Sequence, residues 1–326
     1  MKTELLPFTG DENTPLPGIL WLPEGRPRLV LQVVHGMTEH MGRYEALAEK
    51  LTAEGIAVAG FDLRGHGQNP DAPLERPRLG CTRCGSLGSH DRCASFGRDG
   101  WACSLEDMRI FRGILTGRFP GIPLVLLGFS LGSFLVRDLL HFYDDPVDGV
   151  VLMGTGCQSA AALAMAKLVA KDQIRKAGFN STTPMVDHLT FQSYNSKFAP
   201  NRTPADWLCS DPAQVDAYLA DPLCRRSISA GLFWQLLDSM QRTGSPRTYE
   251  KWARKDLPVL LLSGGEDPVG GFGKDVTQVA ETMKKAGLTR VELHLFPGCR
   301  HDILHETESG SDEKVLEKLL DFLNLI

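Results

Sequence analysis

Short apolar runs alternate with longer segments of helical period through the first half of the chain. The runs predict buried strands, and the segments between them, in which apolar residues recur every three or four positions, predict amphipathic helices. Strands are predicted at 29–34, 56–61, 124–129 and 149–153, and helices at 43–54, 101–118 and 131–143. Strands that are apolar on both faces and alternate with helices are typical of a mostly parallel central sheet flanked by helices, so the predicted class is α/β. Residues 4–8 and 19–22 alternate polar with apolar positions and predict antiparallel edge strands.

This pattern breaks after residue 156. Residues 157–250 favour helix, are rich first in Ala and Leu and then in Pro, Asp and aromatic residues, and contain no β-branched strand run. The earlier pattern returns with strands at 259–263 and 291–296 and helices at 273–286 and 313–325. We therefore predict an α/β core formed by residues 1–156 and 251–326, interrupted by a helical cap of residues 157–250.

A candidate nucleophile lies between a predicted strand and a predicted helix. The segment Gly128-Phe129-Ser130-Leu131-Gly132 matches the pattern G-x-S-x-G. Its two glycines allow a sharp turn with little side-chain bulk, which exposes the serine hydroxyl at the end of the strand and above the start of the helix. Because the apolar strand and the amphipathic helix are both present, we expect Ser130 to be a catalytic nucleophile.

A serine hydroxyl needs a base, and the base needs an orienting acid. In this type of fold the acid and then the histidine follow late strands. The strand at 259–263 leads into Glu266 and Asp267, and the strand at 291–296 leads into His301. We expect Asp267 to orient His301 and His301 to carry the proton, with Glu266 as the alternative acid.

The oxyanion of an acyl-transfer intermediate needs donors already in place. We expect one to be the backbone N–H of Leu131, directly after the nucleophile. The other should come from the loop after the first parallel strand, where Gly36 permits close approach and the N–H of Met37 is the candidate. His35 in this loop is expected to hydrogen-bond to backbone rather than to act in catalysis.

With these residues in place, the chain resembles the monoacylglycerol lipase and lysophospholipase group of α/β-hydrolases, a grouping that includes serine aminopeptidase-like domains. Four stretches carry the resemblance: 35–44, 62–67, 128–132, and 264–269 with 298–306. It implies the α/β-hydrolase fold, a Ser130–Asp267–His301 triad, and Met37 and Leu131 as oxyanion donors. It further implies that the insertion covers the site and forms an acyl-chain pocket, and that Asp62 and Arg64 stabilise a neighbouring loop.

Composition narrows the class of partner. The chain has 326 residues and a net charge of −5, with Lys and Arg scattered, which argues against nucleic acid. The start resembles no signal peptide and no apolar run is long enough to cross a membrane, so a cytoplasmic protein is the expectation. Peripheral contact of the cap with lipid stays open, no cofactor is implied, and the oligomeric state is not predicted.

Four cysteines at 81, 84, 93 and 103 fall within a short span that is not characteristic of the resembled group. Zinc ribbons use two C-x2-C pairs, and only one such pair is present, formed by Cys81 and Cys84. Ordinary thiols are therefore favoured over a metal site, and Cys103, inside a predicted helix, is expected to be a core residue.

The predicted function is hydrolysis of carboxylic esters through an acyl-enzyme, with a lipid-like monoester favoured because the cap is rich in apolar and aromatic residues. A proline-type aminopeptidase or amidase would use the same triad but needs a cap carboxylate for the substrate amine. Five cap aspartates are candidates for that carboxylate: Asp187, Asp206, Asp211, Asp216 and Asp221. A non-catalytic binding module is the third alternative.

Overall fold

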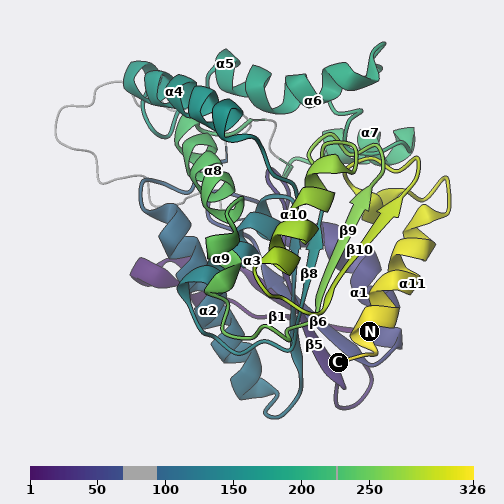
Figure 1. Ribbon diagram of the computed structural model, residues 1–326. Helices are drawn as coiled ribbons and strands as arrows, with labels where there is room; N and C mark the ends of the chain where they lie inside the picture. The colour runs from purple at the N-terminus through teal and green to yellow at the C-terminus, as the bar shows by residue number, and fades with distance from the viewer. Residues whose placement is uncertain (69–93, 225–226) are drawn as a thin grey trace.

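A computed structural model describes residues 1–68, 94–224 and 227–326. Its centre is an eight-stranded sheet in the order β1-β4-β6-β5-β7-β8-β9-β10 (Figure 1). Strands β5 to β10 run parallel to one another, whereas β1 and β4 are antiparallel to their neighbours. The strands are β1 Lys2–Leu5, β4 Gly18–Leu22, β5 Leu29–Val34, β6 Ile56–Phe61, β7 Leu124–Phe129, β8 Gly149–Met153, β9 Val259–Gly264 and β10 Val291–Phe296, with β2 Phe8–Thr9 and β3 Pro15–Leu16 forming a separate pair.

Helices cover both faces of this sheet. The helices of the core are α1 Glu45–Ala53, α2 Gly100–Arg118, α3 Leu131–Phe142, α10 Lys274–Lys285 and α11 Ser311–Leu323. Between β8 and β9 lie α4 Ala160–Ala177, α5 Pro184–Asp187, α6 Ser193–Asn195, α7 Pro212–Ala220, α8 Ala230–Thr243 and α9 Pro246–Glu250. The predicted α/β class, with a mostly parallel sheet flanked by helices, is confirmed.

Strand β7 illustrates why the sequence forms this sheet. All of its residues are buried, and successive side chains point to opposite faces. Leu124 and Leu126 join the apolar cluster beneath α2, α3 and α10, while Val125 and Leu127 join the cluster beneath α1 and α11. A strand of this kind needs apolar residues at every position, and this is the pattern that the sequence shows.

The connections around β5 determine where a site can form. From β5 the chain passes to β6 on one side and later to β7 on the other, so the loops after β5 and β7 diverge above the sheet. In parallel α/β sheets, ligands bind at the carboxyl ends of strands next to such a reversal of strand order. Helices α4 to α7 lie above these strand ends in Figure 1.

Some predicted boundaries are wrong. The strand expected at 4–8 is two strands, because β1 ends at Leu5 and β2 pairs with β3 instead of joining the main sheet. Of the two strands predicted to lie at an edge, β1 does so, whereas β4 lies between β1 and β6. The helix expected at 43–54 begins as a 3-10 turn over Met41–Tyr44, which the side chain of His40 caps by accepting from the Gly42 amide.

The described part of residues 157–250 is helical, as predicted. Helix α8 packs against α3, and its apolar residues belong to the same buried cluster as those of the core. The cap boundaries at 157 and 250 therefore stay a prediction. Of the cysteines singled out above, Cys103 is a buried residue of α2, and burial raises the pKa of its thiol to about 12. Cys81, Cys84 and Cys93 lie outside the described residues.

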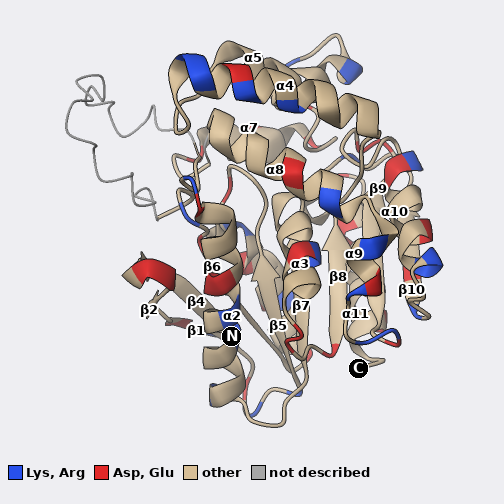
Figure 2. Cartoon of the chain, turned by 60° about the vertical axis from the view of Figure 1, so that its left-hand side comes forward, with Lys and Arg blue, Asp and Glu red and all other residues tan. Residues whose placement is uncertain are grey.

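Charge is spread over the surface. Figure 2 shows basic and acidic positions intermixed along the helices. Within residues 1–68, 94–224 and 227–326, no helix combines the length and the apolar character that crossing a bilayer requires.

Candidate active site

Ser130 lies on a strained turn between β7 and α3. Its backbone is left-handed, with φ 49° and ψ −116°, a conformation that costs a serine about 1–3 kcal/mol. Both flanking glycines are required. A Cβ on Gly132 would lie 2.0 Å from the carbonyl oxygen of Val34, and one on Gly128 would lie 2.5 Å from that of Gly132. The turn is held by the Ser130 N–H, which donates to the Met153 carbonyl at 2.9 Å.

His301 and Asp267 are hydrogen-bonded to each other although they are far apart in the sequence. Nδ1 of His301 lies 2.9 Å from Oδ1 of Asp267, and the two residues are 1% and 0% exposed. The same carboxylate oxygen accepts from the Val269 amide at 2.8 Å. Glu266, the alternative acid, is exposed to solvent. The geometry thus favours Asp267 over Glu266 as the orienting acid.

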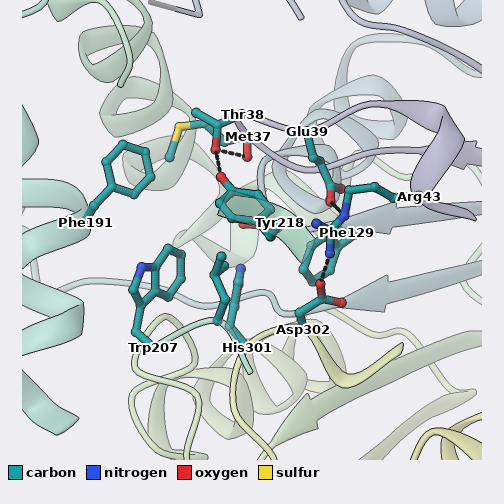
Figure 3. Close-up of a pocket in the computed structure, with 12 residues that line it drawn as sticks. Met37, Thr38, Glu39, Arg43, Phe129, Phe191, Trp207, Tyr218, His301 and Asp302 are labelled. Atoms are coloured by element: carbon teal, nitrogen blue, oxygen red, sulfur yellow. Dashed lines mark hydrogen bonds and ion pairs between the residues drawn. The ribbon is translucent and has the colours of Figure 1, made fainter. Parts of the chain in front are cut away.

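One pocket brings together Ser130, His301 and Met37. Figure 3 shows His301 and Met37 at this pocket. Leu131 is the first residue of α3, so its amide is one of the first-turn N–H groups that have no acceptor inside the helix. The structure therefore places the predicted nucleophile, base and loop donor around one space. The catalytic role of each residue, including Leu131 and Asp267, stays a prediction.

The loop that carries Met37 is pinned by buried side chains. Oε1 of Glu39 accepts from the Gly36 amide at 2.5 Å and from the Tyr44 hydroxyl at 2.7 Å. Nδ1 of His35 lies 2.8 Å from the Gly36 carbonyl, and its Nε2 accepts from the Leu63 amide at 2.9 Å. Burial lowers the pKa of His35 to about 3, so the ring is neutral and supports the backbone, as predicted.

Arg43 connects this loop to the segment that follows His301. Its Nε lies 3.1 Å from Glu39, and its Nη2 is paired with Asp302. Burial opposes ionisation of Asp302, but His305 and Arg43 together hold the pKa of this carboxyl below its usual range. Arg43, Glu39 and Asp302 all line the pocket, and we did not predict this charged edge from the sequence.

Trp207 also lines the pocket, and the sequence analysis gave it no specific role. Its ring lies 5.0 Å from that of His301 at an interplanar angle of 32°, and Phe129 lies 5.0 Å from the same ring on the core side. The imidazole is thus packed between a cap residue and a core residue. Trp207 was one of many aromatic residues in the cap, and no sequence signal distinguished it from the others.

The five cap aspartates have structural partners. Asp206 accepts from the Arg202 and Thr203 amides, Asp211 caps α7, and Asp221 lies 2.8 Å from His40. Asp216 pairs with Arg202, and Asp187 accepts from Thr182 at 3.4 Å. Within the described residues none of the five lines the pocket. The two acids that do line it, Glu39 and Asp302, are paired with Arg43.

One group of side chains has the composition of a metal site. Ligand atoms of His40, Asp221 and Cys224 lie within 4.8 Å of one another. However, Nδ1 of His40 accepts from the Gly42 amide at 3.1 Å, so in the neutral ring the proton is on Nε2, which faces Asp221 at 2.8 Å. The nitrogen that would bind a metal therefore donates a hydrogen bond to the carboxylate.

The predicted support by Asp62 and Arg64 has a precise form. Asp62 accepts from the Met41 and Gln68 amides, both at 2.8 Å, and thereby holds the loop beside the site. Arg64 points elsewhere: it makes a two-pronged contact with Asp107 of α2, at 2.6 and 2.9 Å. The prediction is right for Asp62, whereas Arg64 secures α2.

We expect kcat/KM for ester hydrolysis to increase with pH through a midpoint above about 6.5, the ordinary histidine value. Burial opposes protonation of His301, but the attraction of Asp267 raises its pKa above the ordinary histidine value. Only the neutral ring can accept a proton from Ser130, so activity appears as His301 deprotonates. The free energy of unfolding has the opposite pH dependence. The pairing of the charged His301 ring with Asp267 stabilises the fold at low pH, and this contribution is lost as the pH rises through the raised pKa.

A pH–rate profile checks this expectation. His294, whose side chain is 31% exposed and paired with Glu292 on β10, supplies the control variant His294→Gln, whose midpoint should be that of the unmodified enzyme. A midpoint at or below the ordinary histidine value would contradict the assigned pairing of His301 with Asp267.

Residues 25–308 match the model of the family described as serine aminopeptidase, S33. The chain belongs to this family. Within the S33 family, it is an α/β-hydrolase of the monoacylglycerol lipase group, so the resemblance seen in the sequence is confirmed.

Two curated relatives illustrate the similarity. A monoacylglycerol lipase of Mycolicibacterium smegmatis is 26% identical over 298 residues, which cover 89% of this chain and 86% of that protein. The human monoglyceride lipase is 25% identical over 296 residues, which cover 88% and 79%. Among solved structures, a thermostable carboxyl esterase from Bacillus coagulans in complex with glycerol superposes with a TM-score of 0.85 at 24% identity, covering 100% of this chain and 99% of that one. At this identity the superposition shows the fold alone.

Proposed function

We propose that this S33 family member hydrolyses esters of lipid-like alcohols, with monoacylglycerols and lysophospholipids as the favoured substrates. The chain is a carboxylic ester hydrolase. One observation carries the proposal for the site. Ser130 projects from a strained turn into the pocket that also holds His301, and His301 is hydrogen-bonded to the fully buried Asp267.

The proposed reaction has two acyl-transfer steps. His301 takes the proton of Ser130 as its oxygen attacks the ester carbonyl, and the oxyanion is bound by the amides of Met37 and Leu131. The tetrahedral intermediate collapses, and His301 protonates the departing alcohol. Water then enters, loses a proton to His301 and attacks the acyl-enzyme. Collapse of the second intermediate releases the acid and returns the proton to Ser130.

The pocket lining supports an amphiphilic substrate. Most of the side chains around Ser130 and His301 are apolar or aromatic: Met37, Phe129, Phe191, Trp207, Leu208 and Tyr218. Glu39, Arg43 and Asp302 add a polar edge on the same pocket. Such a lining suits an acyl chain joined to a hydroxylated head group. An aminopeptidase is less well supported, because the described cap aspartates are engaged elsewhere.

We also propose peripheral contact of the cap with lipid. Met165 and Leu168 of α4 are each 65% exposed, and Met185 of α5 is 46% exposed. These helices form the outermost layer above the sheet in Figure 1, and the exposed Lys171 follows Leu168 by three positions on α4. Exposed apolar residues beside a lysine are typical of helices that lie at a lipid interface.

A substrate series tests the proposed substrate class. We expect kcat/KM for p-nitrophenyl esters to rise by up to about fourfold per methylene beyond acetyl, until the pocket is filled, because each buried CH₂ contributes about 0.8 kcal/mol. Medium- or long-chain 1- and 2-monoacylglycerols should be hydrolysed with a kcat/KM comparable to that of p-nitrophenyl esters of the same acyl length. Prolyl p-nitroanilide is the comparison substrate and Ser130→Ala is the blank. Highest efficiency on acetyl would exclude an acyl pocket, and faster turnover of the anilide would favour the aminopeptidase.

A further inference from the structure

Thr38, next to the proposed oxyanion donor Met37, has an unusual backbone conformation. Its φ is 64°, in the left-handed region, and the residue is 2% exposed. Branching at Cβ makes this conformation particularly unfavourable for threonine, whereas glycine adopts it freely. A threonine held in this way indicates that its side chain has a task that glycine could not perform.

The hydroxyl of Thr38 links the loop to the cap. Oγ1 donates to the Met37 carbonyl at 2.6 Å, and Oγ1 also lies 2.8 Å from the hydroxyl of Tyr218 on α7 (Figure 3). Thr38 has one hydroxyl proton, which the Met37 carbonyl receives, so Tyr218 is the donor in the second bond. Burial raises the pKa of Tyr218 well above its usual value, which keeps its hydroxyl protonated and able to donate.

A second contact joins the same two segments. Asp221 follows directly after α7 and accepts from Nε2 of His40 at 2.8 Å. The guanidinium of Arg43 lies 5.0 Å from the centre of the Tyr218 ring. The C-terminal end of α7 therefore contacts one core loop at two points: Tyr218 contacts Thr38, and Asp221 contacts His40.

The contacts on either side of Met37 come from two different parts of the molecule. On one side, the Gly36 carbonyl, which shares a peptide unit with the Met37 N–H, lies 2.8 Å from Nδ1 of His35 in the core. On the other side, the Met37 carbonyl is held by Thr38, whose hydroxyl in turn depends on Tyr218 of the cap. Only the second arrangement would be lost if α7 moved away from the core.

We propose that Tyr218 is a positioning residue for the oxyanion hole: through Thr38 it holds the Met37 carbonyl and thereby restricts rotation of the Met37 backbone, so the Met37 N–H is fully in place only when α7 rests on the core loop. The inference rests on the proposed function, since it takes Met37 as an oxyanion donor. Its consequence is that enclosure of the substrate by the cap and stabilisation of the transition state occur together. Preorganised donors are effective because they need no reorganisation during the reaction.

Tyr218→Phe tests the proposal, with p-nitrophenyl acetate as a substrate too small to reach far along the pocket. We expect kcat to fall about ten- to hundredfold with KM changed less than about twofold, because an interaction made mainly in the transition state is weakened. Tyr194→Phe is the matched control, since it removes the same hydroxyl from a cap tyrosine whose ring packs on Trp207. That control should retain the kcat of the unmodified enzyme.

A double-mutant cycle identifies the partner. Thr38→Val keeps the branched shape but removes the hydroxyl, so it should lower kcat as Tyr218→Phe does, whereas Thr38→Ser should restore most of the rate. The double variant should be no slower than the slower single variant, because both remove one hydrogen-bonded unit. Additive losses would overturn the proposal and indicate that Tyr218 contacts the substrate directly. A loss expressed in KM alone would also overturn it.

Two variants distinguish a failure of the proposed function from a failure of the proposed role of Tyr218. If Ser130→Ala retains ester hydrolysis, the proposed function is wrong. If Ser130→Ala is inactive and Tyr218→Phe has an unchanged kcat, the triad stands and only the role of Tyr218 is wrong. Thermal unfolding of each variant, measured in the assay buffer, ensures that rates are compared between folded proteins.

Discussion

Replacing Ser130 with alanine is expected to abolish ester hydrolysis, with a loss in kcat of about 10⁶-fold, and to abolish labelling by a fluorophosphonate. The Ser130 hydroxyl is the only group on this turn that can form the acyl-enzyme. Alanine at this position has no hydroxyl proton for His301 to take and no oxygen to attack the ester. Rates of p-nitrophenyl ester hydrolysis and mass spectrometry of the labelled protein measure the two outcomes.

Ser196→Ala is the control for this experiment. Ser196 is an exposed serine of the cap whose hydroxyl donates to the Ser193 carbonyl, and its loss should leave both hydrolysis and labelling intact. Labelling of Ser130→Ala at another residue would mean that the nucleophile has been misassigned. If the unmodified protein neither labels nor hydrolyses esters, the binding-module alternative is favoured instead.

Replacing Asp267 with asparagine should lower kcat by about 10⁴-fold while leaving the fold intact. The carboxylate accepts the proton on Nδ1 of His301 and so keeps Nε2 free to act as the base. An amide at this position can donate to Nδ1, which favours the tautomer that carries its proton on Nε2. That tautomer cannot accept a proton from Ser130, and the positive charge formed on the ring also loses its neighbouring anion.

Glu266→Gln provides a neighbouring comparison for this prediction. Glu266 precedes Asp267 in the same turn, but its side chain is exposed and we expect its loss to change kcat by less than about twofold. Steady-state kinetics of the two variants, together with their circular dichroism, separate a catalytic effect from misfolding. A nearly unchanged Asp267→Asn beside an inactive Glu266→Gln would reverse the assignment of the acid.

Much of the fold could be predicted because burial leaves a local pattern. The strand at 124–129 was predicted with the bounds of β7, since a strand between two helical layers must be apolar at every position. The first piece of the chain was predicted less well. Residues 4–8 alternate as one strand would, yet pairing with β4 stops after the Leu6 amide has donated to the Gly18 carbonyl, because Pro7 has no N–H with which to continue it.

Some residues of the candidate site could likewise be predicted from the sequence, and others could not. Ser130, Asp267 and His301 could be predicted as a triad because each follows a predicted strand and because the turn around Ser130 requires glycines at fixed spacing. The partners of Arg43 and the position of Trp207 against His301 were not found. A cap with many aromatic residues gives no local signal for which of them reaches the core.

The sequence by itself therefore determined the class of fold and the order of its strands along the chain, and it predicted a nucleophile with two partners. These follow from periodicity and from turns that only certain residues permit, and both are properties of neighbouring positions. The tertiary structure alone decided which cap residues enclose the pocket and that Thr38 and Tyr218, separated by 180 positions, share a hydrogen bond. Such contacts depend on how a long helical insertion folds back over the sheet, and many apolar and aromatic side chains could have met the loop equally well.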